Sequence, residues 1–174
     1  MIGLGLSVTK PHVEGFTGIL NSYGGSIGAY STRRLSSSYF GNALTVRRAS
    51  DNATLNIGFT PAGDLDITTL EAHCDSTDGF VTTWYDQSGG GNNFTQSTAA
   101  HQPKIVASGS AIKIGTRVVF QFGSDASNTY FMDLGSAKTF TDEFFTSIVV
   151  KPTTNSNAFG VLLNASGSAQ NRVR

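Results

Sequence analysis

The stretch Gly79–Gln96, which reads GFVTTWYDQSGGGNNFTQ, decides the fold. Its first half, residues 80–85, carries the β-branched and aromatic residues that favour a pleated strand. Its second half, residues 86–93, gathers glycine, asparagine, aspartate and serine, which supply positive φ angles and side-chain-to-backbone hydrogen bonds. The stretch therefore predicts a buried strand that ends in an elaborate surface loop.

The composition around this stretch suits one all-β domain with a hydrophobic core. The chain has 174 residues, of which 39% are hydrophobic and 14% charged, and its small polar residues are typical of strands and turns. Twelve basic residues balance twelve acidic ones, so we expect no nucleic-acid partner. Cys74 is the single cysteine, which excludes an intramolecular disulfide. The first residues lack a basic segment, so we expect no signal peptide and no membrane insertion.

Strands are predicted on both sides of the opening stretch, at 44–49, 54–59, 79–85, 103–107, 116–122, 129–133, 144–151 and 158–163. The segments 117–122 and 144–151 are the strongest core candidates, because they are rich in β-branched and aromatic residues. Asp66 is an N-cap signal for a short helix over 67–74, and residues 29–39 fit one or two helical turns. The fold class is therefore all-β, an antiparallel β-sandwich or jelly roll with one or two short helices.

Residues 1–28 differ from the rest of the chain. They are rich in glycine, show no sustained hydrophobic period and contain a Lys-Pro break. Two interpretations stay open: a flexible leader, or an extended anchoring arm that orders against a partner chain. We divide the chain into an N-terminal arm, residues 1–28, and a β-sandwich domain, residues 29–174.

The end of the predicted strand and its loop supply the candidate residues for glycan or interface contact: Trp84, Tyr85, Asp86, Asn92 and Asn93. Trp84 and Tyr85 could stack on a sugar ring, but at least one of two neighbours in a strand points into the core. Burial beside these rings could raise the pKa of Asp86. We favour the other interpretation, in which its carboxylate accepts backbone N–H bonds and fixes the loop.

No catalytic residue, cofactor or metal site is predicted. The loop 86–93 lacks the second carboxylate and the bidentate glutamate of strong calcium loops, and no phosphate-binding motif follows it. The histidines have no paired metal-ligand spacing. The doublets Arg33-Arg34 and Arg47-Arg48 are expected to form ion pairs with nearby aspartates, the alternative being contact with a neighbouring subunit.

Several pieces of the chain resemble the N-terminal part of the catalytic domain of α-L-arabinofuranosidase B, a concanavalin-like β-sandwich glycosidase. In order, they are AYSTRRLSSSY (29–39), LTVRRASDNATLNIGF (44–59), LEAHC (70–74) and TTWYDQSGGGNNFTQ (82–96). The resemblance implies a concanavalin-like sandwich. It also implies a cysteine partner for Cys74 a few residues on, which is absent here, and catalytic carboxylates in later segments. No catalytic residue is carried over, and we expect a protein that is not an enzyme.

The same block resembles domains in virion proteins of tailed bacteriophages. There WYDQSG-x-GN and a segment like Gln102–Val106 recur without the enzyme's cysteines. We therefore expect a structural virion protein, a tail, fibre or other appendage subunit located in the virion. Residues 1–28 would bind other virion proteins, the sandwich would form a homo-oligomer, and outer loops would contact a host-surface glycan. The alternative is a carbohydrate-binding or arabinofuranosidase-like glycoside hydrolase fragment.

Overall fold

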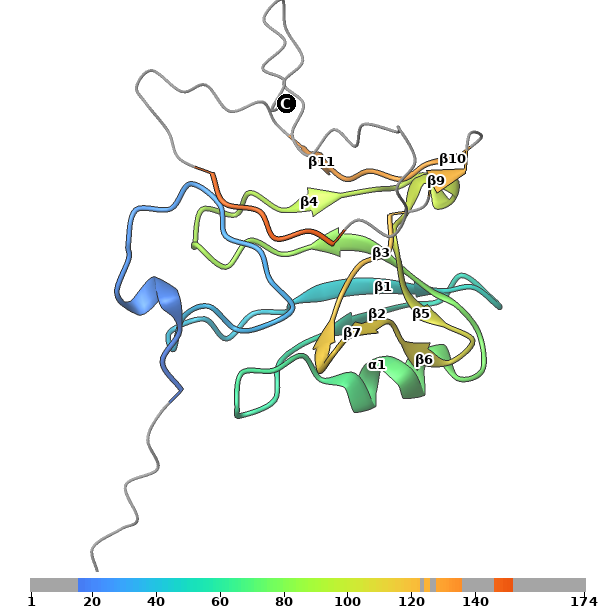
Figure 1. Cartoon of the computed structure of the whole chain (residues 1–174), viewed down its shortest axis with the longest axis horizontal. Coiled ribbons are helices and arrows are strands. Elements are labelled where there is room, and N and C mark those ends of the chain that lie inside the picture. The colour runs from blue at the N-terminus through green and yellow to red at the C-terminus, as the bar shows by residue number, and fades with distance from the viewer. Residues whose placement is uncertain (1–15, 123, 126–127, 136–145, 152–174) are drawn as a thin grey trace, which may run out of the picture. The chain divides into compact units, whose positions relative to one another are not determined.

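The computed structural model describes residues 16–122, 124–125, 128–135 and 146–151 (Figure 1). The chain divides into two compact units, residues 1–137 and 138–174. All elements named below belong to the first unit. Of the second unit the described residues are 146–151.

A seven-stranded antiparallel sheet, counted over the described residues, forms the body of the first unit. Its main path runs β11 (Asp133–Leu134), β4 (Phe94–Thr95), β3 (Gly79–Trp84), β1 (Leu44–Arg48) and β2 (Thr54–Ile57). Off this path lie β5 (Lys104–Ala107) and β6 (Ser110–Ala111). Two small ribbons complete the strands: β7 (Lys113–Ile114) with β8 (Arg117–Val118), and β9 (Ser124–Asp125) with β10 (Asn128–Thr129).

The outer edge of β3 is forked. One edge of β3 pairs along its length with β1. The other edge pairs with β4 at Thr83 and Trp84 and with β5 at Gly79 and Phe80. Residues 96–103 bridge this fork, and they contain the 3₁₀ turn η2 (Ala99–His101). The sheet therefore opens into two branches beside its central strand.

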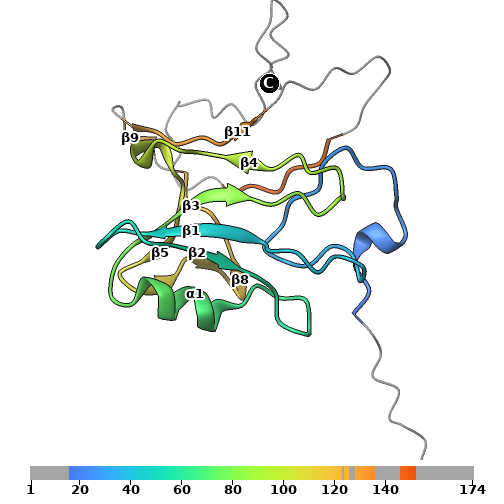
Figure 2. The ribbon, with the colours of Figure 1, turned by 180° about the vertical axis from the view of Figure 1, so that it is seen from behind.

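One short α-helix packs against the sheet. The helix α1 (Ile67–Cys74) begins after Asp66, whose side chain accepts a hydrogen bond from the Thr69 backbone N–H at 3.0 Å. Such an N-cap satisfies one of the backbone donors that the first turn leaves without a partner. In Figures 1 and 2 the helix lies below β1 and β2, and it buries Leu70 and Cys74 against the sheet. A 3₁₀ turn, η1 (Ile19–Asn21), lies in the N-terminal segment.

A bulge in β3 sets which side chains face the core. Val46 lies opposite Val81 and Leu44 opposite Trp84, and the register shifts between these two pairs. The shift gives β3 one more residue than β1, which interrupts the usual alternation. Because residues directly opposite in a ladder share a face, Val81 and Trp84 both lie on the core side although they are three positions apart.

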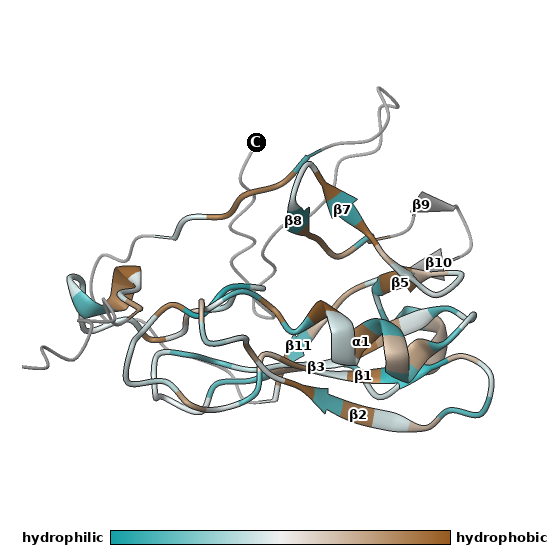
Figure 3. Ribbon diagram, turned by 90° about the horizontal axis from the view of Figure 1, so that it is seen from below, coloured by the Kyte–Doolittle hydropathy of each residue, from teal (hydrophilic) through white to brown (hydrophobic). Residues whose placement is uncertain are grey.

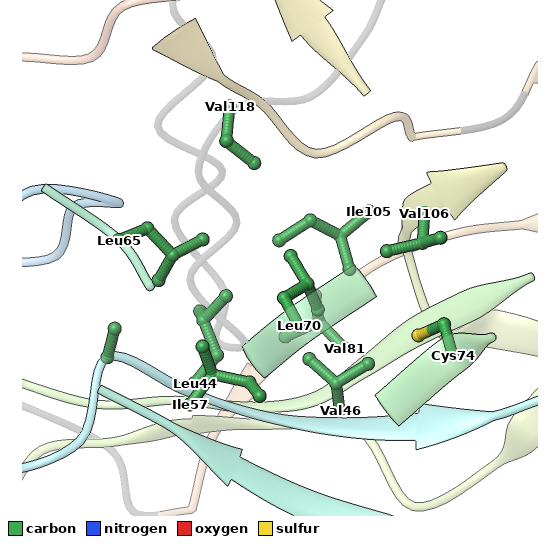
Figure 4. Close-up of a cluster of buried hydrophobic side chains, with 11 residues drawn as sticks. Leu44, Val46, Ile57, Leu65, Leu70, Cys74, Val81, Ile105, Val106 and Val118 are labelled. Atoms are coloured by element: carbon green, nitrogen blue, oxygen red, sulfur yellow. The ribbon is translucent and has the colours of Figure 1, made fainter. Parts of the chain in front are cut away.

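The core gathers buried side chains from β1, β2, β3, β5, β8 and α1. Its members are Ala43, Leu44, Val46, Ile57, Leu65, Leu70, Cys74, Val81, Ile105, Val106 and Val118, most of them labelled in Figure 4. In Figure 3 the strands β1, β2 and β3 lie to one side of this core and β7 and β8 to the other. The hydrophobic effect of this burial is the main term that stabilises the unit.

The predicted fold class is confirmed: within the described residues the sheets are antiparallel and α1 is the α-helix. The helix spans the predicted residues 67–74. Two predicted core strands differ. In the segment 117–122 only Arg117–Val118 forms a strand. Residues 146–151 of the predicted strand 144–151 are exposed and form no strand, since β propensity needs a pairing partner to be realised. The predicted strand 158–163 lies outside the described residues.

The predicted helical turns over 29–39 do not form. Serine hydroxyls accept the backbone N–H groups there: Ser31 Oγ bonds the Arg33 N–H at 3.0 Å, and Ser36 Oγ bonds the Ser38 N–H at 3.2 Å. Such local bonds compete with the helical pattern. The backbone of 29–35 is instead bonded to the loop after β3.

The described part of the predicted arm, residues 16–28, lies against the chain's own sheet unit. The Arg34 guanidinium stacks on the Phe16 ring, 4.3 Å from its centre, and the Leu20 N–H donates to the Leu35 carbonyl at 2.8 Å. A Cβ on Gly18 would lie 2.1 Å from the Leu35 oxygen, so this close approach requires glycine. Residues 1–15 lie outside the described residues, and binding of the arm to another chain stays a prediction.

Candidate functional site

Asp86 fixes the loop that follows β3. It is buried, with 4% of its surface exposed. Its carboxylate accepts backbone N–H bonds from Ala29 at 2.9 Å, Ser88 at 2.8 Å and Asn92 at 3.1 Å, and a hydroxyl bond from Ser88 at 2.8 Å. Burial raises the pKa of Asp86, but the bonds from Ser88 and Ala29 outweigh it and the net shift is downward. The side chain is therefore a charged structural acceptor.

Gln87 also attaches the loop after β3 to residues 29–35. Its amide oxygen accepts the Leu35 N–H at 2.8 Å, and its amide nitrogen donates to the carbonyls of Ser31 at 3.1 Å and Arg33 at 3.0 Å. Its own N–H donates to the Ala29 carbonyl at 2.7 Å. We call Asp86 and Gln87 together the clasp, because they hold residues 29–35 against the end of β3.

Asn92 and Asn93 close the loop around the clasp. The Asn92 side chain donates to the Ile27 carbonyl, and the Asn92 backbone carbonyl accepts the Tyr30 hydroxyl. Asn93 Oδ1 accepts the Asp86 N–H at 3.0 Å. Burial, and then the Asp86 charge, raise the pKa of Tyr30 to about 12, so the phenol remains a donor at neutral pH. The predicted residues Asp86, Asn92 and Asn93 are thus brought together as a structural network.

Trp84 and Tyr85 lie on opposite faces of the sheet. Trp84 packs on the core side, with its ring 4.6 Å from that of Phe120 and 5.6 Å from that of Tyr30. The Tyr85 hydroxyl lies on the other face, 3.0 Å from Thr45 Oγ1. The two rings therefore do not form one stacking platform.

A cleft of about 240 Å³ lies beside the clasp, and we call it the serine cleft. It is lined by Leu20, Tyr23–Ser26, Ser36, Ser38, Tyr39 and Gln87–Gly89. No aspartate, glutamate, lysine or arginine lines it. Its walls are hydroxyl groups, two tyrosine rings and glycine backbone, a combination that suits a neutral polar ligand. The serines and glycines of 22–26 and 36–38 were visible in the sequence, but nothing local indicated that they would meet.

A second cleft of about 220 Å³ contains a shared ion pair. Asp64 lies 3.0 Å from Arg33 Nε and 3.3 Å from Arg117 Nη1, and all three side chains are about half exposed. Arg48 pairs with Asp51 at 2.6 Å. One arginine of each doublet therefore forms a predicted internal ion pair, and the second arginine of each doublet stacks on a phenylalanine ring.

Several of the described carboxylates are engaged in structural bonds. Asp66 caps α1, Asp78 pairs with Lys104 at 2.6 Å, and Glu71 accepts the Ala111 N–H at 2.9 Å. No acidic residue lines the serine cleft, and Asp64 is the one acidic residue of the second cleft. Neither cleft in the described part of the chain thus holds the pair of facing carboxyl groups that glycoside hydrolysis requires.

Neither a metal-binding cluster nor a membrane-spanning helix occurs in the described residues. No cluster of three or more histidine, cysteine, aspartate or glutamate residues that could hold a metal ion occurs in the described ranges. None of the helices there is long and apolar enough to cross a bilayer. Cys74 is a buried free thiol, and burial raises its pKa.

Comparison with known protein families shows to which family the chain belongs. A model of the family described as alpha-L-arabinofuranosidase B, catalytic, matches residues 21–161. This match covers most of the sequence, and the chain belongs to that family.

Curated relatives are fungal enzymes. The alpha-L-arabinofuranosidase B of Emericella nidulans is 45% identical over 73 residues, which cover 41% of this chain and 14% of the relative. That of Aspergillus oryzae is 35% identical over 100 residues, covering 55% of this chain and 20% of the relative. The chain thus matches a fifth or less of the length of these relatives.

Two solved structures are similar to part of the chain. An arabinofuranosidase complexed with arabinofuranosyl-alpha-1,2-xylobiose is 39% identical, covers 40% of this chain and 15% of its own, and has a TM-score of 0.38. A GH54 a-l-arabinofuranosidase soaked with a cyclic sulfate inhibitor is 30% identical, covers 45% of this chain and 19% of its own, and has a TM-score of 0.41.

These findings overturn the predicted function. The expectations of a structural virion protein, of a virion location and of a protein that is not an enzyme are wrong, because the chain belongs to a catalytic family whose relatives are fungal arabinofuranosidases. The resemblance to bacteriophage proteins rested on the WYDQSG loop and on a segment like Gln102–Val106. The loop makes structural contacts with residues 27–35, and a shared structural feature does not by itself determine function.

Proposed function

We propose that this chain is part of a glycoside hydrolase of the α-L-arabinofuranosidase type. The observation that carries the proposal is the match of the catalytic family over residues 21–161. The names of the curated relatives support the substrate class, an α-L-arabinofuranoside. The proposal replaces the virion function and retains the alternative that the sequence left open.

Within this function the described residues act as the scaffold of the catalytic domain. Hydrolysis of a glycoside needs two carboxyl groups, about 5–5.5 Å apart in retaining enzymes and about 6.5–9.5 Å apart in inverting ones. The carboxylates of Asp51, Asp66, Asp78 and Asp86 each accept hydrogen bonds from their own domain. Neither of the two clefts holds such a pair, and we infer that the reacting carboxyl pair lies outside them.

The test compares two ring forms of one sugar. The chain is incubated with 4-nitrophenyl α-L-arabinofuranoside and, as a control, with 4-nitrophenyl α-L-arabinopyranoside. In parallel, saturation-transfer NMR measures binding of the methyl glycosides. We expect release of nitrophenol, or saturable binding, with the furanoside and not with the pyranoside. The absence of both turnover and selective binding with the furanoside would refute the proposal.

A further inference from the structure

We propose that the serine cleft binds a neutral sugar unit of an oligosaccharide. The inference rests on the proposed function for the identity of the oligosaccharide, and on the cleft for the chemistry of recognition. It deepens the proposed function by giving the described residues a ligand contact of their own.

The lining excludes charged ligands and suits hydroxyl groups. All of its polar side chains are uncharged at neutral pH, namely those of four serines, two tyrosines and one glutamine. An ion would lose its hydration there without meeting an opposite charge, which is unfavourable. A sugar hydroxyl both donates and accepts, as do the hydroxyl groups of the walls. Ser88 Oγ already donates to Asp86 at 2.8 Å, and the hydroxyls of Ser36 and Ser38 bond to each other at 2.8 Å, so these three contact a ligand through their remaining bonding capacity. The Tyr39 hydroxyl donates to the Asn42 carbonyl at 2.8 Å, which leaves its oxygen able to accept from a ligand.

Aromatic rings supply the apolar part of the contact. Tyr23 is 70% exposed, so its ring offers a free face at the mouth of the cleft. Tyr39 is held by an edge-on contact with Phe59, with ring centres 6.3 Å apart. Tyrosine combines an apolar ring with a polar tip and loses little conformational freedom on binding. The C–H face of a sugar ring can therefore pack on a tyrosine while its hydroxyl groups bond to the serine walls.

The walls are fixed before any ligand arrives. Every hydrogen-bonding group of the Gln87 amide except one lone pair of its oxygen is used by backbone groups of residues 31–35. Asn21 Oδ1 accepts the Ser37 N–H at 2.9 Å, and its amide donates to Ser37 Oγ at 2.7 Å. These bonds tie the wall formed by 20–26 to the wall formed by 36–39. A site that is already ordered binds with a smaller loss of conformational entropy.

Glycine leaves the cleft open. A Cβ added at Gly24, Gly25 or Gly89 would meet no atom within 4 Å. Gly25 and Gly89 have positive φ angles of 81° and 90°, which explains their glycine without a ligand. Gly24 lines the cleft and has no such backbone requirement, so a larger side chain there adds bulk to the lining without straining the fold. This makes Gly24 the position at which the cleft can be blocked.

The experiment titrates arabinofuranosyl-α-1,2-xylobiose into the unmodified chain and into two variants, by isothermal calorimetry. Gly24→Leu places a bulky side chain in the lining of the cleft. Gly58→Leu is the matched control, because a Cβ at Gly58 also meets nothing within 4 Å and Gly58 does not line the cleft. We expect Gly24→Leu to weaken binding at least about tenfold, which corresponds to ~1.4 kcal/mol, and Gly58→Leu to bind like the unmodified chain.

Tyr23→Ala is a second variant of the cleft, beside Gly24→Leu. Tyr23 is exposed, so the substitution does not endanger the fold, and it should weaken binding about fivefold to tenfold. Binding unchanged by both cleft variants would overturn the inference and leave the proposed function standing. No binding of the trisaccharide to the unmodified chain would also overturn it. The release of nitrophenol from the aryl furanoside would then decide the proposed function separately.

Discussion

At the scale of single residues, Asp86 shows how one carboxylate organises a loop. It joins the end of β3 to Ala29, which is 57 positions away in the chain, and it also holds Ser88 and Asn92. Removing an acceptor from buried donors costs the desolvation of each donor that is left without a partner. The clasp is therefore the place where a change of one atom has the largest structural effect.

Asp86→Asn should destabilise the chain by about 2–4 kcal/mol, because the amide keeps one acceptor oxygen and places an NH₂ group against backbone donors. Urea unfolding followed by tryptophan fluorescence measures the change. Asp75→Asn is the control, since Asp75 is exposed and should change stability by less than about 0.5 kcal/mol. Equal effects of the two substitutions would contradict the structural role of Asp86.

The same residue predicts a pH dependence. The folded-state pKa of Asp86 lies below the ordinary value of 3.8. A lowered pKa contributes stability that is fully present above the unfolded value and is lost as pH falls through the folded value. The stability difference between the unmodified chain and Asp86→Asn should therefore be largest at neutral pH and shrink below about pH 4. A difference that stays constant down to pH 2 would show that the charge is not involved.

The sequence predicted the type of role for Asp86 but not its partners. An aspartate before a glycine-rich turn indicates backbone acceptance, which holds here. Nothing near Asp86 in the sequence indicated Ala29, and nothing near Ser36 indicated Gln87, because these contacts depend on how distant segments pack. The serine cleft was missed for the same reason.

At the scale of elements, the sequence predicted an element correctly where the residues of that element determine its structure by themselves. The helix α1 has an N-cap aspartate and a short apolar face, and it forms over the predicted residues. The segment 29–39 shows the opposite case. Its sequence fits one or two helical turns, but its serines bond the backbone locally, and Gln87 of the clasp binds the Leu35 N–H. Tertiary hydrogen bonds thus decided its conformation.

The contact between α1 and β3 provides a test of packing. A Cβ at Gly79 would lie 2.5 Å from Cys74 Sγ and 3.1 Å from Val106 Cβ. Gly79→Ala should therefore destabilise the chain by about 1–3 kcal/mol through overpacking. Adding Cys74→Ala removes the sulfur atom and should recover part of that loss, which a double-mutant cycle in urea measures. Strictly additive effects would contradict the packing of Gly79 against Cys74.

At the scale of the whole molecule, the predicted homo-oligomer remains to be measured. Phe40 is 87% exposed and Ile19 is 60% exposed, and exposed apolar side chains of this size favour self-association when they gather on one surface. We expect light scattering to give a mass above that of one chain at high concentration, and Phe40→Ser to lower it. A monomer at every concentration would contradict the prediction.

The fork in the outer edge of β3 has a consequence for how the domain opens. The gap between the branches is filled by amides: Gln102, which is 2% exposed, donates to the Gln96 carbonyl at 2.9 Å and accepts from Arg47 at 2.7 Å. Amide groups form hydrogen bonds with water once a bond within the protein breaks, whereas the side chains of the apolar core do not. Local opening of the native state should therefore begin between the two branches of the sheet. Deuterium should replace the amide protons of 96–103 before those that link β1 to β3.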